Sequence, residues 1–112
     1  MDMYQTIKEN ARAGFVEILI LELLTERDMY GYEIGQELKN RANGVFIQAE
    51  GSLYTPLYRL ERNGFVSSYK TLEDDKYRRF YHIEENGLEY LSLAKKEIKT
   101  VYKVVMNILK LD

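Results

Sequence analysis

The 112-residue chain contains no cysteine, no tryptophan and only one proline. Without cysteine it can form neither a disulfide nor a thiolate zinc site, and a cytoplasmic location is the expectation. No apolar run approaches the roughly 20 residues that a membrane-spanning helix needs, and the first residues lack the apolar centre of a signal peptide. What the chain does have is 46% apolar residues, enough for one packed domain.

The chain also lacks the excess of positive charge that is usual in nucleic-acid-binding proteins, since its net charge is −2. The charge is unevenly distributed, however. Residues 1–49 carry a net −3, residues 50–83 a net +1, and residues 84–112 are balanced. Three of the acids in the middle block cluster at Glu73–Asp75, which leaves the rest of that block locally basic. The charge distribution therefore permits DNA binding without indicating it.

Patterns that mark catalytic and metal sites are missing as well. The chain has no glycine-rich phosphate loop and no cluster with metal-ligand spacing, so we expect neither a cofactor nor a metal. Its single histidine, His82, falls in a β-prone run near Arg79 and Glu84, with no fixed carboxylate partner evident. That setting is typical of a surface strand residue rather than of a general base. An enzyme is therefore not expected.

The most informative segment spans residues 51–66. Three leucines recur at i, i+4 and i+7 and so share one helical face: Leu53, Leu57 and Leu60. Ser52 is expected to cap this helix and Asn63 to end it, which keeps Pro56 near the first turn, where proline is tolerated. The opposite face carries residue types that hydrogen-bond phosphates and base edges: Tyr54, Thr55, Tyr58 and Arg62. A short helix of this kind leading directly into a strand is typical of a winged helix-turn-helix.

The N-terminal half divides into further elements. Apolar periodicity predicts a first helix from about Gln5 to Glu26 and a second from Gly31 to Arg41, with Asp28 as the N-cap of the second. Asn43-Gly44 is expected to end the second helix. Val45–Ile47 is apolar and long enough for a small strand.

The C-terminal half predicts a hairpin and a long helix. Two β-prone runs, Phe65–Thr71 and Tyr77–Ile83, are joined by a tip at Leu72–Lys76. The last helix is expected from Glu85 to Leu109, with Tyr102 adding an e position to apolar residues at heptad a and d spacing: Leu91, Ala94, Ile98, Val101, Val105 and Ile108. The predicted fold class is mainly α with a small β-hairpin. Residues 1–83 would form the winged helix-turn-helix, and residues 84–112 a long C-terminal dimerisation helix.

This order of elements resembles the PadR family of transcriptional regulators. The resemblance rests on blocks that occur in order and with compatible spacing: Tyr30–Ile34, Gly51–Glu61, Gly64–Val66, Arg78–Ile83 and Gly87. It implies a cytoplasmic, homodimeric winged-helix repressor of the short subtype, with a single C-terminal helix. Two positions depart from the family pattern. Thr55 stands where the family often has proline, and Glu84 replaces the usual threonine, which removes a good N-cap.

The helix at residues 52–63 is expected to enter the major groove of duplex DNA. Its candidate contacts to phosphates or bases are Ser52, Tyr54, Thr55, Tyr58, Arg59 and Arg62. The alternative is an ordinary surface helix whose tyrosines lie flat on their neighbours, and Arg59 has the further alternative of a structural ion pair with Glu61 or another acid. Tyr30 is another candidate phosphate contact, because it opens the second helix and helix N-termini bind anions readily.

Basic side chains of the hairpin are candidates to hold backbone phosphates beside that helix: Lys70, Lys76, Arg78 and Arg79. The alternative is a solvated hairpin. The acidic run Glu73–Asp75 favours that alternative, because DNA would repel carboxylates at the tip. We therefore expect the strands to approach phosphate while the tip points away.

The heptads of the last helix need a second surface to pack against. At 1.5 Å per residue, about 24 residues extend roughly 36 Å, well past a domain this small. We expect two copies to associate through the first and last helices, with Phe15 joining the heptad residues in the interface. The resemblance further implies that a planar aromatic effector can bind there, with Phe15, Ile98, Tyr102 and Met106 as candidate lining. Plain packing is the alternative for these four residues, and the chain has no tryptophan to stack on a ligand.

The sequence therefore predicts a homodimeric, sequence-specific DNA-binding regulator, most simply a repressor. Its two-fold symmetry predicts a pseudopalindromic operator with half-sites about one helical turn apart. The alternative is a winged-helix protein-interaction module that does not bind DNA, which the net acidity and Glu73–Asp75 favour.

Overall fold

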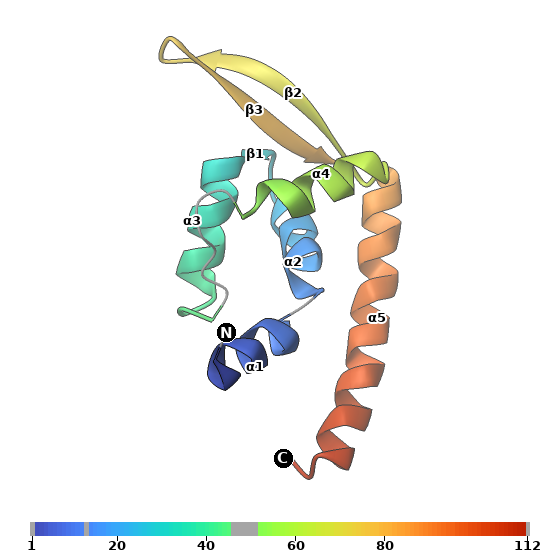
Figure 1. The fold of residues 1–112 in the computed structure, drawn as a ribbon. Helices are drawn as coiled ribbons and strands as arrows, with labels where there is room; N and C mark the ends of the chain where they lie inside the picture. Colours follow the sequence, from blue (N-terminus) through green and yellow to red (C-terminus); the bar gives the residue numbers. More distant parts are fainter. Residues whose placement is uncertain (1, 13, 46–51, 112) are drawn as a thin grey trace.

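The computed structural model of the chain describes residues 2–12, 14–45 and 52–111. Within these residues the elements follow in the order α1 (Met3–Arg12), α2 (Phe15–Leu24), β1 (Met29–Tyr30), α3 (Gly31–Arg41), α4 (Tyr54–Arg62), β2 (Val66–Glu73), β3 (Lys76–Ile83) and α5 (Glu85–Ile108). The β2–β3 hairpin stands beyond α3 and α4 at one end, and α5 runs from its root to the opposite end (Figure 1). The predicted fold class, mainly helical with a small antiparallel sheet and a long C-terminal helix, is confirmed.

The core lies where α2, α3 and α4 meet beneath the sheet. Ile20, Leu21 and Ile34 are completely buried, and Leu57 and Leu60 of α4 are nearly so. Helix α2 is apolar on almost every side, as a helix must be when it contacts α3, α4 and α5 at once. The core therefore fixes the inner face of α4 and leaves its outer face to solvent.

The sheet has the strand order β1-β3-β2, with both pairings antiparallel. Strand β1 is the short run Met29–Tyr30, which pairs with Phe80 and Tyr81 of β3. The third strand of this sheet is therefore β1, and the small strand expected at Val45–Ile47 falls largely outside the described residues. Val45 lies in a turn, and the other two residues lie outside the described residues. Periodicity could not indicate β1, because two residues are too few to show a pattern.

The hairpin is tighter than the predicted five-residue tip. Strand pairing continues to Glu73 opposite Lys76, so only Asp74 and Asp75 form the turn. Both have positive φ, 50° and 64°, as the central residues of a type I′ turn require. Aspartate tolerates this conformation better than most residues do. The acidic pair therefore has a structural role at the end of the hairpin.

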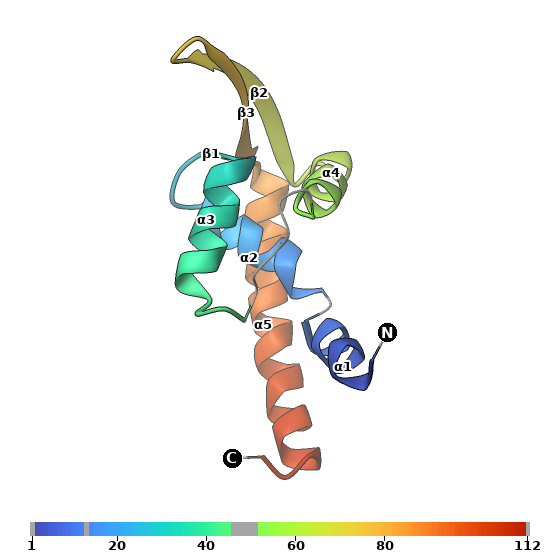
Figure 2. The ribbon, with the colours of Figure 1, turned by 60° about the vertical axis from the view of Figure 1, so that its left-hand side comes forward.

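The single helix expected from Gln5 to Glu26 is two helices. Gly14 precedes α2 with φ of 86°, a left-handed conformation that cannot continue an α-helix and that glycine adopts without steric cost. The predicted apolar stripe is therefore broken, and Ile7 of α1 is 55% exposed. In both ribbon views α1 lies apart from the core, on the side toward the distal half of α5 (Figures 1 and 2).

Two predicted N-caps are also wrong. The N-cap of α3 is Tyr30 rather than Asp28, and the backbone N–H of Tyr30 donates to the Glu33 carboxylate at 3.2 Å. The N-cap of α4 is Leu53 rather than Ser52, so the helix begins at Tyr54 and ends at Arg62. Pro56 is then the third residue of the helix, within the first turn, where no backbone donor is lost.

Helix α5 begins against the core. The backbone of Gly87 lies so close to the carbonyl oxygen of Phe65 that a Cβ at this position would overlap it, which accounts for a glycine inside a helix. Leu91, one turn later, is 4% exposed and belongs to the core of its own chain. The first turns of α5 are thus continuous with the winged-helix body.

Candidate nucleic-acid interface

Helix α4 separates into two faces, as its sequence predicts. Pro56, Leu57 and Leu60 are buried. Tyr54 and Tyr58 are 63% and 65% exposed, and Thr55 and Arg62 are also exposed. Ser52 lies exposed in the turn just before the helix. The structure therefore brings these five candidate contacts together on one outer surface.

Arg59 is held differently from its neighbours on α4. Its Nε donates to Oε1 of Glu17 at 2.7 Å. The structural ion pair that the sequence left open is therefore present, with Glu17 of α2 as the partner rather than Glu61. The Arg59 side chain is still 59% exposed, so the pair orients the guanidinium without covering it. No local pattern indicated this contact, because the two residues are 42 positions apart.

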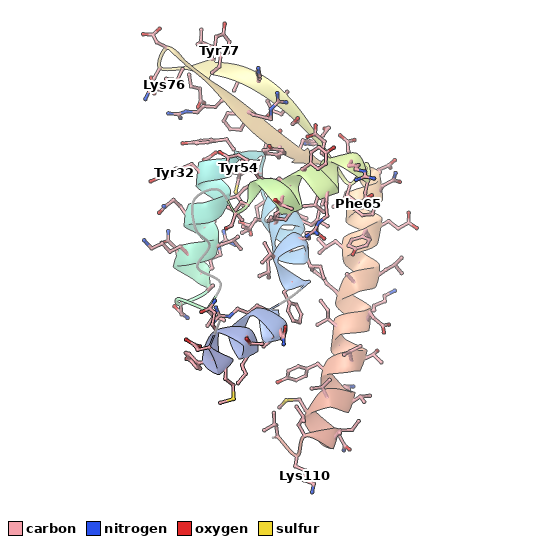
Figure 3. The ribbon with its side chains drawn as sticks, viewed as in Figure 1. Tyr32, Tyr54, Phe65, Lys76, Tyr77 and Lys110 are labelled. Carbon is pink, nitrogen blue, oxygen red and sulfur yellow. The ribbon has the colours of Figure 1, made fainter. Side chains whose placement is uncertain are left out.

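The N-termini of α3 and α4 lie side by side. The Tyr54 ring lies against Gly31, so that a Cβ at Gly31 would meet it at 3.8 Å. Figure 3 shows Tyr54 and Tyr32 near the same end of α3, below the hairpin.

Tyr30 itself is partly covered. Its ring stacks on Tyr32 with centroids 6.3 Å apart, meets the edge of Phe80, and lies under the Arg78 guanidinium at 4.7 Å. The Tyr30 N–H already donates its hydrogen bond to the Glu33 carboxylate. The N-terminus of α3 is therefore less available to bind an anion than the sequence suggested.

The register of the hairpin divides its basic residues between two faces. Lys70 and Arg79 are directly opposite each other, and Arg79 lies on the same strand face as Tyr81, whose side chain is buried against the core. This pair therefore lies on the face that continues toward α4. Arg78 and Lys76 lie on the other face. There Arg78 also contacts the Glu73 carboxylate at 3.3 Å.

A short chain of hydrogen bonds joins α4 to this face of the hairpin. The Arg79 guanidinium donates to Oγ of Ser68 at 2.8 Å, and Ser68 Oγ donates to Oε2 of Glu61 at 2.6 Å. Burial raises the pKa of the neighbouring Tyr81 phenol. The Glu61 carboxylate raises that pKa further and Arg79 opposes the rise, which places both charged groups near Tyr81. Sequence reasoning missed Glu61 and Ser68 as members of this surface.

His82 has the fixed carboxylate partner that the sequence did not reveal. Its Nδ1 lies 2.8 Å from Oδ1 of Asp28, and the Tyr69 hydroxyl donates to Oδ2 of the same carboxylate at 2.7 Å. This hydrogen bond raises the pKa of His82 despite some burial. Burial alone would raise the pKa of Asp28, but hydrogen bonds from Tyr69 and His82 hold it below its usual value. The cluster ties both hairpin strands to the segment between α2 and β1.

The predicted dimer residues occupy several environments. Leu91 is buried within its own chain, whereas Ala94, Ile98 and Met106 are partly buried. Five others are exposed: Phe15, Val101, Tyr102, Val105 and Ile108. The distal half of α5 extends past the other helices toward Lys110 (Figure 3). Helix α1, which exposes the apolar residues Met3, Tyr4 and Ile7, lies toward the same end of the molecule (Figure 1).

The fold and the outer face of α4 define a winged-helix protein. The pattern of the transcriptional regulator PadR-like family matches residues 20–93, so the chain belongs to this family of transcriptional regulators. None of the described helices combines the length and apolar character that a membrane span requires.

Relatives support the same assignment. An uncharacterized protein X of Lysinibacillus sphaericus is 35% identical, over 88% of this chain and 92% of its own. A transcriptional regulator structure from Clostridium thermocellum is 34% identical with a TM-score of 0.81, over 88% of this chain and 96% of its own. A PadR family transcription regulator from Clostridium difficile is 31% identical with a TM-score of 0.73, over 86% and 98% of the two chains.

Proposed function

We propose that this PadR-like regulator is a homodimeric repressor that binds a pseudopalindromic operator. The observation that carries the proposal is the exposed row of Tyr54, Tyr58 and Arg62 on a helix whose other face is anchored in the core. A rigid helix with hydrogen-bonding side chains outward fits a major groove. Lys70 and Arg79 extend the same surface onto the hairpin, where they would hold backbone phosphates.

The second copy is proposed to join through α1 and α5, at residues that one chain leaves exposed. Residues 1–83 would then carry DNA binding, and residues 84–112 would carry dimerisation, with their first turns also packed into the core. Two recognition helices related by a two-fold axis would meet half-sites about one helical turn apart. Phe15, Ile98, Tyr102 and Met106 would line a site in that interface where a small aromatic effector relieves repression.

Binding to duplex DNA from the region upstream of the protein's own coding sequence tests this function. Wild type should bind with an affinity that falls as salt rises. Tyr58→Ala and Arg62→Ala should each weaken binding by about 1–3 kcal/mol where the side chain contacts bases. Lys96→Ala is the matched control, because it removes one exposed positive charge from α5, away from α4.

Equal binding by wild type, Tyr58→Ala and Arg62→Ala would reject α4 as the recognition helix. The alternative function, a protein-interaction module, is favoured by the acidic turn at Asp74 and Asp75. Under that alternative, wild type would show no salt-dependent binding to any duplex, while Arg62→Ala would keep full affinity for the protein partner.

A further inference from the structure

Helix α4 carries an acid on the surface where DNA binding is proposed. Tyr54, Tyr58 and Glu61 follow each other at i, i+4 and i+7, so the carboxylate continues the row of exposed tyrosines. A carboxylate facing the phosphate backbone should by itself oppose binding, because like charges repel. The contacts of Glu61 within the chain indicate a different role.

The Glu61 carboxylate is the end of the hydrogen-bond chain through Ser68. A hydroxyl has one proton to donate and lone pairs to accept, and Ser68 Oγ uses both capacities. It donates to Glu61 at 2.6 Å and accepts from Arg79 Nη1 at 2.8 Å. Both hydrogen bonds involve a charged partner, and such bonds are the stronger kind. Only one of the five guanidinium donors of Arg79 is used in its bond to Ser68.

Arg79 also needs such a restraint. Lys70 is its direct cross-strand neighbour, and two positive charges directly opposite each other on one face repel. Without a counter-charge, the long Arg79 side chain would turn away from Lys70. The negative charge on Glu61 offsets this repulsion, and the serine hydroxyl fixes the direction of the guanidinium. The three residues come from α4, β2 and β3, so the same chain of bonds sets the hairpin against the helix.

We propose that Glu61 is a positioning residue for DNA binding, which acts through Ser68 to hold Arg79 against a backbone phosphate beside the recognition helix. This inference rests on the proposed function and deepens it. It makes a prediction opposite in sign to simple electrostatics. Removal of an acid from a DNA-facing surface should strengthen binding if the acid only repels phosphate. It should weaken binding if the acid positions a phosphate-binding side chain.

The test measures binding of the full chain to the same upstream duplex over a series of salt concentrations. Glu61→Ala should bind more weakly than wild type, and its slope of log K against log salt should fall by about 0.9 for each phosphate that the variant no longer neutralises. Ser68→Ala should show the same weakening, and Arg79→Ala a weakening at least as large. Glu61→Gln keeps an acceptor for the Ser68 hydroxyl and should retain more of the slope than Glu61→Ala.

Two further variants separate positioning from other effects. The double variant Glu61→Ala with Arg79→Ala should bind no more weakly than Arg79→Ala, because both changes remove the same interaction with DNA. Asp75→Asn removes a carboxylate from the same hairpin without touching the three bonded residues, so its slope should match that of wild type. Thermal unfolding of each variant checks that the variant is folded under the binding conditions. If Glu61→Ala is unfolded there, Ser68→Ala tests the positioning role in its place.

Binding by Glu61→Ala that equals or exceeds that of wild type would overturn the positioning role. Additive effects in the double variant would overturn it as well. Failure of the proposed function looks different, because wild type itself would then bind no duplex and both proposals would fall together.

Discussion

The two ends of the molecule treat their exposed side chains in opposite ways. Around α4 and the root of the hairpin, two of the arginines bond within the chain, Arg59 to Glu17 and Arg79 to Ser68. The distal half of α5 instead exposes large apolar side chains: Val101, Tyr102, Val104, Val105, Ile108 and Leu109. Contiguous exposed apolar surface of this kind marks an interaction site.

The proposed dimer accounts for this difference, because a second copy would cover the apolar side chains that one chain leaves exposed. Ion pairs and hydrogen bonds fix the geometry of the surface that is proposed to meet DNA. Among the described residues, no ion pair joins the distal half of α5 to another element, and its apolar side chains are stabilised when they leave water. Substitutions at one end of the molecule should therefore leave the other end unaffected.

The largest effect is expected from the core that anchors α4. Leu57→Ala removes a side chain that is 1% exposed, and it should lower the free energy of unfolding by about 2–5 kcal/mol. Leu72→Ala is the control, because Leu72 lies near the exposed end of the hairpin and should cost at most about 1 kcal/mol. Urea unfolding at one protein concentration compares them. Similar decreases for the two variants would mean that α4 is not anchored as described.

A smaller effect is expected from the His82 and Asp28 pair. The folded-state pKa of His82 is raised above 6.5, so its stabilising contribution is complete below pH 6.5 and is lost as the pH rises through the raised value. The advantage of wild type over His82→Gln in melting temperature should therefore be greatest below pH 6.5 and shrink above it. The advantage over Asp28→Asn should shrink in the same way, since that variant removes the cause of the shift. A constant difference at every pH would contradict this.

Local patterns predicted the helices and the hairpin, but not the contacts that orient the site. Helix α3 begins and ends where its periodicity indicated, and α5 ends within one residue of the expected position. The Glu17–Arg59 pair joins residues 42 apart and the Asp28–His82 pair residues 54 apart. Such contacts depend on how the elements pack against one another. This packing cannot be predicted from the apolar periodicity of a short stretch of sequence. The break at Gly14 was equally hidden, because glycine is tolerated inside a helical pattern.

The same reason explains the errors near Asp28. Its residue type and position favoured an N-cap. In the fold, the Tyr69 hydroxyl and the His82 ring take both of its carboxylate oxygens, and Glu33 accepts the hydrogen bond from the backbone N–H of Tyr30 instead. Long-range partners outweighed the local preference.

The mass of the protein in solution shows whether a second copy covers the distal α5 surface, as proposed. Sedimentation of wild type at micromolar concentration should give twice the chain mass of 13.3 kDa. Val105→Asp, which places a charge in the middle of that surface, should give the single-chain mass while its helical circular dichroism is retained. A wild-type particle of 13.3 kDa would rule out the proposed dimer.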